Sequence, residues 1–240
     1  MSNEFTINPA LDASALAEAY RIRGRLDVPD FLVPSQADML LHHLTTRSDW
    51  VTVLNAGEKT YELPRARLPE LSAEQRQALD QSVIEAARTD FQYRFDAIRA
   101  PDGGGGASLL DRFVAFLSSP TTLDFLASVT GHPDIAFADG QATAYQSGDF
   151  LTAHDDAVAG KNRRAAYVFG LTPVWSADWG GLLMFHGNDG NIAEAFTPGM
   201  NRLRLFSVPV CHSVSYVAPF AGASRLSVTG WLRARPAANQ

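Results

Sequence analysis

The pattern of apolar and polar positions divides the chain into a helical first half and a strand-rich second half. Helical spacing follows good N-terminal caps at Ser35 and at Ser72, where Gln75 completes a capping-box pattern. The apolar, β-branched composition of the second half is instead typical of strands. The elements predicted before residue 134 are helices over 15–23, from Ser35, from Ser72 to about Ala97 and from Ser108 onward, and a strand over 50–54.

Two strand-like regions follow. Residues 145–153 read as a strand, a turn marked by Gly148, and a second strand. Residues 203–218 form an apolar, β-branched run with His212 near its middle. The glycines of 103–106 lack the lysine and the serine or threonine of a phosphate loop, so we expect a linker or a lid there.

The candidate chemistry lies where these strands end. Side chains at positions i and i+2 of an extended segment project to the same side, so His154 and Asp156 can face one metal ion while Asp155 faces away. His212 could supply a third ligand, and we expect its neighbour Cys211 to point the other way, into the core. Two imidazoles and one carboxylate are the facial triad of non-heme Fe(II) sites.

Each of these residues also has an ordinary explanation. A lone histidine in an apolar strand is usually a core residue, two aspartates before Ala157 could cap a turn, and Arg225 could be a surface arginine. Their occurrence together, in this order and on strand-like segments, favours a metal site.

Residues from about Tyr145 to Arg233 carry a family resemblance. The chain resembles the iron- and 2-oxoglutarate-dependent dioxygenases, and their prolyl 4-hydroxylase-like branch in particular. The matching stretches are Tyr145-x-x-Gly-Asp-Phe-Leu-x-x-His-Asp-Asp156, Arg164-x-x-Tyr-x-x-x-Leu171, Trp179-Gly-Gly-x-Leu183, Asn201-Arg202, His212-x-Val214 and Arg225-Leu-Ser-Val-Thr-Gly-Trp231.

The resemblance implies an α+β protein with a double-stranded β-helix (jelly roll) core and supporting N-terminal helices. We expect one domain over 1–240, with a helical scaffold and the first strands in 1–133 and the catalytic β-helix in 134–240. His154, Asp156 and His212 would bind the metal.

The same resemblance implies Fe(II), O₂ and 2-oxoglutarate as a co-substrate, with ascorbate as a further candidate. Arg225 would bind the distal carboxylate of 2-oxoglutarate, which its planar guanidinium matches, and Tyr145 and Ser227 are candidate helpers. Gly170 occupies a position where many of these enzymes place a tyrosine that contacts the co-substrate.

Composition narrows the function further. The chain has 240 residues, of which 46% are hydrophobic, and its net charge of −6 argues against nucleic-acid binding through charge. No apolar run approaches the roughly 20 residues of a membrane span, and the first residues lack a signal-peptide pattern. With a single cysteine, these features predict a cytoplasmic protein without a membrane partner.

The predicted function is hydroxylation of a prolyl residue in a protein or peptide, coupled to decarboxylation of 2-oxoglutarate to succinate. A ribosomal or translation protein is the substrate that the resemblance favours. A free amino acid or other small molecule, a non-catalytic metal-binding or sensing module, and a metal-dependent hydrolase remain alternatives. Neither of the last two needs Arg225.

Overall fold

The computed structural model describes residues 5–102 and 105–235, so Gly103 and Gly104 of the predicted glycine loop lie outside it. The helices lie mostly in the first half of the chain. They are α1 (Ala13–Arg23), α2 (Pro34–Thr45), α3 (Ala73–Ala86), α4 (Leu109–Leu117) and α5 (Pro120–Thr130), with 3₁₀ turns η1 (Arg65–Glu70) and η3 (Ala177–Trp179).

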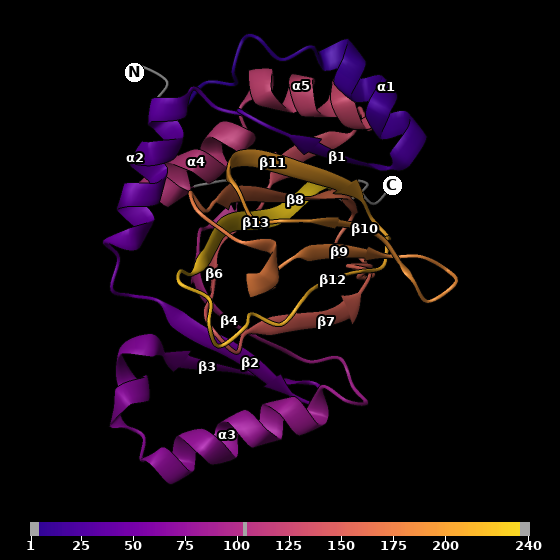
Figure 1. Cartoon of the computed structure of the whole chain (residues 1–240). Helices are drawn as coiled ribbons and strands as arrows, with labels where there is room; N and C mark the ends of the chain where they lie inside the picture. Colours follow the sequence, from indigo (N-terminus) through magenta and orange to yellow (C-terminus); the bar gives the residue numbers. More distant parts are fainter. Residues whose placement is uncertain (1–4, 103–104, 236–240) are drawn as a thin grey trace.

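The strands form one antiparallel sheet that folds back on itself (Figure 1). The strands are β1 (Arg25–Val28), β2 (Val51–Ala56), β3 (Lys59–Pro64), β4 (Tyr93–Arg99), β5 (Ile135–Ala138), β6 (Gln141–Tyr145), β7 (Phe150–His154), β8 (Arg163–Leu171), β9 (Leu183–His186), β10 (Ile192–Phe196), β11 (Met200–Ser207), β12 (His212–Val214) and β13 (Arg225–Ala234).

The order of the strands brings distant parts of the sequence together. The order is β1-β11-β8-β13-β6-β4-β7-β12-β9-β10, with the β2–β3 hairpin attached to β4 and β5 attached to β13. The halves β11-β8-β13-β6 and β7-β12-β9-β10 face each other across a cavity lined by both. This is the predicted α+β fold with a jelly-roll core, and that prediction is confirmed.

Alternation along β8 separates two apolar regions. Phe169 points outward, where its ring lies 5.0 Å from the ring of Phe113 on α4 and 5.9 Å from that of Phe31. Ala166 and Val168 point inward, toward the cavity. Each fully buried phenylalanine contributes about 1.5–3 kcal/mol, so the outer region fixes the helices on the sheet.

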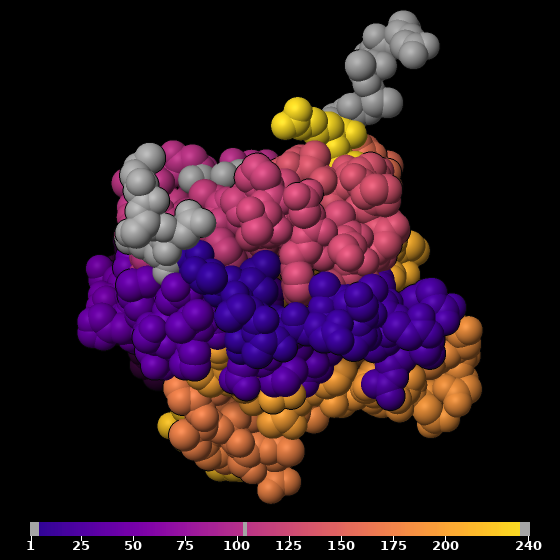
Figure 2. All heavy atoms as spheres, turned by 90° about the horizontal axis from the view of Figure 1, so that it is seen from above, coloured from indigo at the N-terminus to yellow at the C-terminus, as the bar shows by residue number. Residues whose placement is uncertain are grey.

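The N-terminal elements therefore pack on the outer side of the folded sheet, away from the cavity. α1 packs against α5, and β1 pairs with β11. Seen from above, this indigo N-terminal segment forms a band between the pink α4–α5 region and the orange strands of the second half (Figure 2). α3 lies apart, beside the β2–β3 hairpin, where Val83 packs with Leu54 and Phe150 (Figure 1).

Local sequence explains where the helices begin. Asp12 caps α1 by accepting hydrogen bonds from the backbone N–H groups of Ser14 and Ala15. Ser72 with Gln75, and Ser108 with Asp111, form capping boxes at the starts of α3 and α4. The starts at Ser72 and Ser108 agree with the prediction, whereas α1 begins at Ala13 instead of residue 15. The predicted cap at Ser35 is wrong, because α2 begins at Pro34 and its N-cap is Val33, which makes no side-chain hydrogen bond.

The predicted end of the helix that begins after Ser72 is wrong. α3 stops at Ala86, and residues 93–99 form β4 instead of continuing the helix to Ala97. Tyr93, Phe95 and Ala97 alternate with Arg94 and Asp96, and β4 pairs with β2, β6 and β7. Pairing on both sides therefore outweighed the helical spacing.

No single helix in the described ranges is long and apolar enough to cross a membrane; α4 and α5 meet the length and composition test only when taken together, with a bend of 55° between them.

Candidate metal centre

His154 and His212 meet at the mouth of the barrel because their strands are neighbours. His154 is the last residue of β7, His212 is the first of β12, and the two are paired in the antiparallel register. Their ring centroids are 4.1 Å apart. The pairing of β7 with β12 thus brings together two residues that lie 58 positions apart in the sequence.

Both imidazoles are held in the same orientation. Nδ1 of His154 donates a hydrogen bond to the carbonyl oxygen of Thr152 over 3.0 Å, and Nδ1 of His212 donates to that of Val210 over 2.9 Å. A carbonyl only accepts, so the proton lies on Nδ1 and the lone pair on Nε2. This second partner is what metal-binding histidines ordinarily have.

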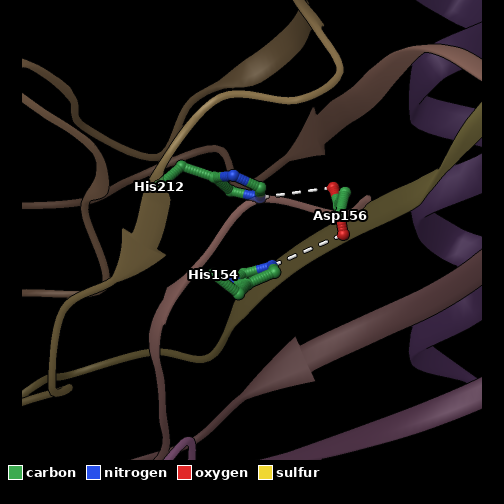
Figure 3. Close-up of side chains that lie close together, drawn as sticks. All are labelled: His154, Asp156 and His212. Carbon is green, nitrogen blue, oxygen red and sulfur yellow. Dashed lines mark ion pairs between the residues drawn. The ribbon is translucent and has the colours of Figure 1, made fainter. Parts of the chain in front are cut away.

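Asp156 completes the cluster (Figure 3). Its Oδ1 lies 3.6 Å from Nε2 of His154, and its Oδ2 lies 3.4 Å from Nε2 of His212. One ligand atom from each of the three residues lies within 4.8 Å of the others. Two imidazole nitrogens and one carboxylate oxygen around one point form the facial set that suits non-heme Fe(II).

Strand alternation predicts that Asp156 and not Asp155 faces His154, and the structure brings Asp156 into the cluster although it lies beyond the strand. Its φ is +63°, the left-handed region that aspartate tolerates better than most residues. Arg163 holds this turn by donating to the main-chain oxygen of Asp156 over 2.8 Å. Asp155 is exposed and its Oδ1 accepts from the backbone N–H of Ala157, so it caps the turn and does not face the cluster.

Electrostatics keep the cluster ready for a cation. Burial, together with the neighbouring His154, lowers the pKa of His212 to about 4, so its imidazole is neutral at physiological pH. Metal binding requires a neutral imidazole. The residues therefore fit a divalent metal ion.

The predicted position of Cys211 is wrong. Cys211 is exposed because it precedes β12 and its side chain does not enter the core. Alternation describes residues inside a strand, and Cys211 lies just outside one.

Arg225 lies at the other end of the same cavity. It is the first residue of β13, paired with Tyr145 on β6, and it is 3% exposed. Its guanidinium carbon lies 4.8 Å from the centroid of the Tyr145 ring. Its Nη1 is buried and has no hydrogen-bond partner among the described residues. A buried cation with an open donor is costly by itself, and an incoming carboxylate would satisfy it.

Tyr145 and Ser227 are placed beside Arg225 by the register. Burial raises the pKa of Tyr145 to about 12, so its hydroxyl keeps its proton. Ser227 is buried on the same face of β13 as Arg225, and its Oγ lies 2.9 Å from Oγ1 of Thr143. Their predicted role in binding the co-substrate stays a prediction.

Gly170 lies opposite Ser227 on β8. A Cβ at this position would collide with the carbonyl oxygen of Gly199, so a tyrosine could not replace Gly170 without moving the backbone. The main chain at Gly199 therefore leaves no room for a side chain at position 170.

The metal cluster and Arg225 line one cavity of about 480 Å³. Sequence reasoning missed several of its walls, namely Arg163 and the aromatic residues Phe91, Tyr93 and Phe95. The alternation of 91, 93 and 95 could have revealed the aromatic wall. A larger cavity of about 800 Å³ lies beside α2, on the outer side of the sheet, and none of its lining residues belongs to the metal cluster.

Comparison with known proteins agrees with this site. Residues 140–233 match the sequence model of the 2OG-Fe(II) oxygenase superfamily. Over 130 residues the chain is 32% identical to the mouse (Mus musculus) protein named prolyl 3-hydroxylase OGFOD1. That match covers 51% of this chain and 22% of the mouse protein, so the chain spans about a fifth of its relative.

Two solved structures resemble the fold. A Pseudomonas putida prolyl-4-hydroxylase is 22% identical with a TM-score of 0.58, and the match covers 94% of this chain and 100% of that one. An oxidoreductase of the 2OG-Fe(II) oxygenase family from Burkholderia pseudomallei is 14% identical with a TM-score of 0.63, and the match covers 98% and 96%. These likenesses concern the fold. Residues 140–233, which include His154, Asp156 and His212 with the strands β7 and β12, are similar to the 2OG-Fe(II) oxygenase superfamily in sequence.

Proposed function

We propose that the protein is an Fe(II)- and 2-oxoglutarate-dependent hydroxylase that acts on a prolyl residue of a protein. One observation carries the proposal. The same cavity holds a cluster of two imidazoles and a carboxylate at one end and a buried guanidinium with an open donor at the other. A metal-binding or sensing module needs only the first, and a metal-dependent hydrolase has no use for the second.

His154, Asp156 and His212 would hold the iron, which supplies O₂ activation when bound. The superfamily uses Fe(II), 2-oxoglutarate and O₂. The overall reaction converts a substrate C–H, O₂ and 2-oxoglutarate into C–OH, succinate and CO₂. One oxygen atom of O₂ enters the product and the other enters succinate.

Arg225 would bind the distal carboxylate of 2-oxoglutarate through its open Nη1. The neutral hydroxyl of Tyr145 lies close enough to assist, and the Ser227–Thr143 pair borders the same face. Because Gly170 brings no side chain, the binding of the acid rests more heavily on Arg225 and Tyr145 than it would with a tyrosine at that position.

Apolar side chains close the cavity around these groups. Val168, Leu183, Phe206 and Val214 line it between the two ends. Apolar walls exclude water from the reacting centre and strengthen the electrostatic contacts inside. The ring of Phe206 also lies 4.6 Å from that of His212, which limits the movement of this ligand.

Two relatives whose names state what they act on support the substrate class. The mouse protein is named a prolyl 3-hydroxylase, and a Trichoplax adhaerens prolyl hydroxylase with the same fold is 16% identical, with a TM-score of 0.59, and was solved with a peptide fragment. We extend this to a prolyl residue of a ribosomal or translation protein in the cytoplasm, a reducing compartment that suits a chain with one cysteine.

Mass spectrometry of the host proteome, with and without the gene, tests the proposal. We expect one prolyl peptide to gain the mass of one oxygen atom only when the gene is present, and to lose this gain with Asp156→Ala. Oxygen gained on a free amino acid, with no modified protein, would favour the small-molecule alternative. No gain anywhere, with no succinate formed by the purified enzyme, would reject the hydroxylase.

A further inference from the structure

A row of four aromatic rings lines one wall of the metal cavity. Phe91, Tyr93 and Phe95 follow one another along β4 and the residues before it, and Tyr145 continues the row on β6. Successive centroids are 5.5, 5.7 and 5.4 Å apart. We call these four residues the aromatic row. Such spacings are those of stabilising aromatic pairs.

The row joins the two ends of the active site. At one end, the Phe91 ring lies 5.5 Å from the ring of the metal ligand His154. At the other end, Tyr145 lies against the guanidinium of Arg225. Exposure falls along the row, from 47% at Phe91 to 3% at Tyr145. Phe91 is therefore the member that an incoming macromolecule meets first, next to the metal.

The exposure of Phe91 contrasts with the rigid backbone that carries it. The side chain of Asn55 donates to the carbonyl oxygen of Phe91 over 2.7 Å and accepts from the backbone N–H of Tyr93 over 2.9 Å. Gln92, between them, is fully buried and bonds to the main chain of Asn55 and to Thr152. An apolar ring held in place at a cavity mouth loses little entropy when a ligand covers it.

The same segment is tied to both flanking strands. The hydroxyl of Tyr93 lies 2.8 Å from Oγ1 of Thr60 on β3, and the backbone N–H of Thr152 on β7 donates to the carbonyl oxygen of Gln92 over 2.9 Å. Thr152 is two residues before His154 on that strand. The backbone that carries the Phe91 ring is therefore fixed relative to His154 by hydrogen bonds on two sides.

A neutral, flat, apolar platform suits a ring without hydrogen-bond donors. The side chain of Phe91 offers no polar atom, and Arg99, which also lines the cavity, is paired with Glu62. A prolyl residue has an apolar ring and no backbone N–H, so it can lie on an aromatic face without leaving a buried donor unsatisfied. Prolyl segments in extended conformation dock against aromatic side chains in many recognition domains.

We propose that Phe91 and Tyr93 form the prolyl subsite, which packs the target proline ring against the Phe91 face and so brings its C–H bonds beside the His154–Asp156–His212 cluster. The proposal rests on the proposed function, because it names the wall that selects proline over other residues at that site. Phe91 and Tyr93 bind substrate through their rings, while Asn55 and Gln92 are positioning residues.

The test measures discrimination between proline and alanine. The probe is a fluorescein-labelled 15-residue synthetic peptide centred on the proline found by mass spectrometry, and its counterpart with alanine there. Binding is measured by anisotropy without oxygen, using enzyme loaded with Mn(II) and 2-oxoglutarate, since Mn(II) accepts nitrogen and carboxylate ligands. We expect wild-type enzyme to bind the prolyl peptide about tenfold more tightly than the alanyl peptide.

Phe91→Ala should bring that ratio close to one, and Phe91→Tyr should restore most of it. The KM for the prolyl peptide should rise with Phe91→Ala by more than the KM for 2-oxoglutarate. Phe220→Ala is the matched control, because Phe220 is 67% exposed in the loop before β13 and does not line the cavity. Melting temperatures of all variants report folding.

An unchanged proline-to-alanine ratio in folded Phe91→Ala would overturn the subsite while leaving the hydroxylase intact. A wild-type enzyme that hydroxylates no prolyl peptide would overturn the proposed function, and the subsite with it. An equal loss of affinity for both peptides would also overturn the subsite, since Phe91 would then only support the cavity mouth.

Discussion

The two ends of the cavity are built in different ways. At the metal end, hydrogen bonds within the protein hold the three side chains in place: both imidazoles donate to main-chain carbonyl oxygens, and Arg163 donates to the main-chain oxygen of Asp156. At the other end, Arg225 is buried with an open Nη1. The first end is assembled in advance, whereas the second is completed only by an acid. This difference separates an oxygenase that needs a co-substrate from a simple metal site.

The largest effect is expected at the metal end. Asp156→Ala removes the anionic ligand, so Fe(II) affinity should fall by more than the roughly 100-fold loss that removal of a mere supporting partner can cause. Asp155→Ala is the control, and we expect less than about a twofold change because Asp155 is exposed. Anaerobic titration with Fe(II) measures both. Similar losses in the two variants would show that the ligand was assigned wrongly.

The next effect separates the two ends. Arg225→Ala should weaken 2-oxoglutarate binding roughly 100-fold, the loss expected when one partner of a buried charged pair is removed. Affinity for Fe(II) alone should change little, and Arg225→Lys should fall between, since lysine keeps the charge without the planar fork. The visible charge-transfer band of the anaerobic Fe(II)–2-oxoglutarate enzyme reports both constants. Equal losses of affinity for Fe(II) and for 2-oxoglutarate would show that Arg225 does not act at the acid end alone.

The third expected effect is a gain in stability instead of a loss of affinity. Without 2-oxoglutarate, the buried Arg225 has no carboxylate partner among the described residues, so Arg225→Met should raise the free energy of unfolding by about 1–4 kcal/mol. Adding 2-oxoglutarate to the Mn(II)-loaded protein should stabilise the wild type further and leave the Mn(II)-loaded variant nearly unchanged. Chemical denaturation, with and without the acid, provides the measurement. If Arg225→Met is less stable than the wild type without 2-oxoglutarate, the Arg225 charge is already stabilised by groups of the protein.

The smallest effect concerns Asp149, a buried charge outside the cavity that does have a partner. Arg94 donates to its Oδ1 over 2.9 Å and the Gln146 N–H to its Oδ2 over 2.8 Å, yet burial raises its pKa from 3.8 to about 7. Between these values the folded state binds one more proton than the unfolded state. The contribution of Asp149 to the free energy of unfolding therefore falls as the pH rises from 4 to 7.

Asp149→Asn should remove this dependence, which amounts to at most about 1.4 kcal/mol per pH unit. Urea unfolding at pH 5, 6, 7 and 8 compares the two slopes, and the wild type should lose stability relative to the variant as the pH rises to 7. Parallel curves would show that the pairing with Arg94 fully offsets the burial.

The cluster of His154, Asp156 and His212 could be predicted from the sequence because a strand pair imposes its geometry locally. The pairing of β7 with β12 brings His154 beside His212. Asp156 was selected by alternation, but a left-handed turn places it, and that turn depends on Arg163 seven residues later. Strand alternation therefore describes only part of what places Asp156 in the cluster.

The acid end depends on contacts that the sequence does not reveal, whereas the alternation of the aromatic row is visible in the sequence but competes with a helical pattern. The open donor of Arg225 is a property of its burial by residues from several strands, and the obstruction at Gly170 comes from Gly199, a neighbour only in space. The aromatic row was missed because residues 93–97 were assigned to a helix. Alternation of Tyr93 and Phe95 became decisive only through pairing with β6 and β7.

A crystal structure of the Mn(II)–2-oxoglutarate complex, grown without oxygen, tests the central claim most directly. The account predicts the metal on Nε2 of His154, Nε2 of His212 and one carboxylate oxygen of Asp156, with the distal carboxylate of 2-oxoglutarate within hydrogen-bond distance of Nη1 of Arg225. A distal carboxylate bound elsewhere, with Nη1 of Arg225 still unpartnered, would contradict it.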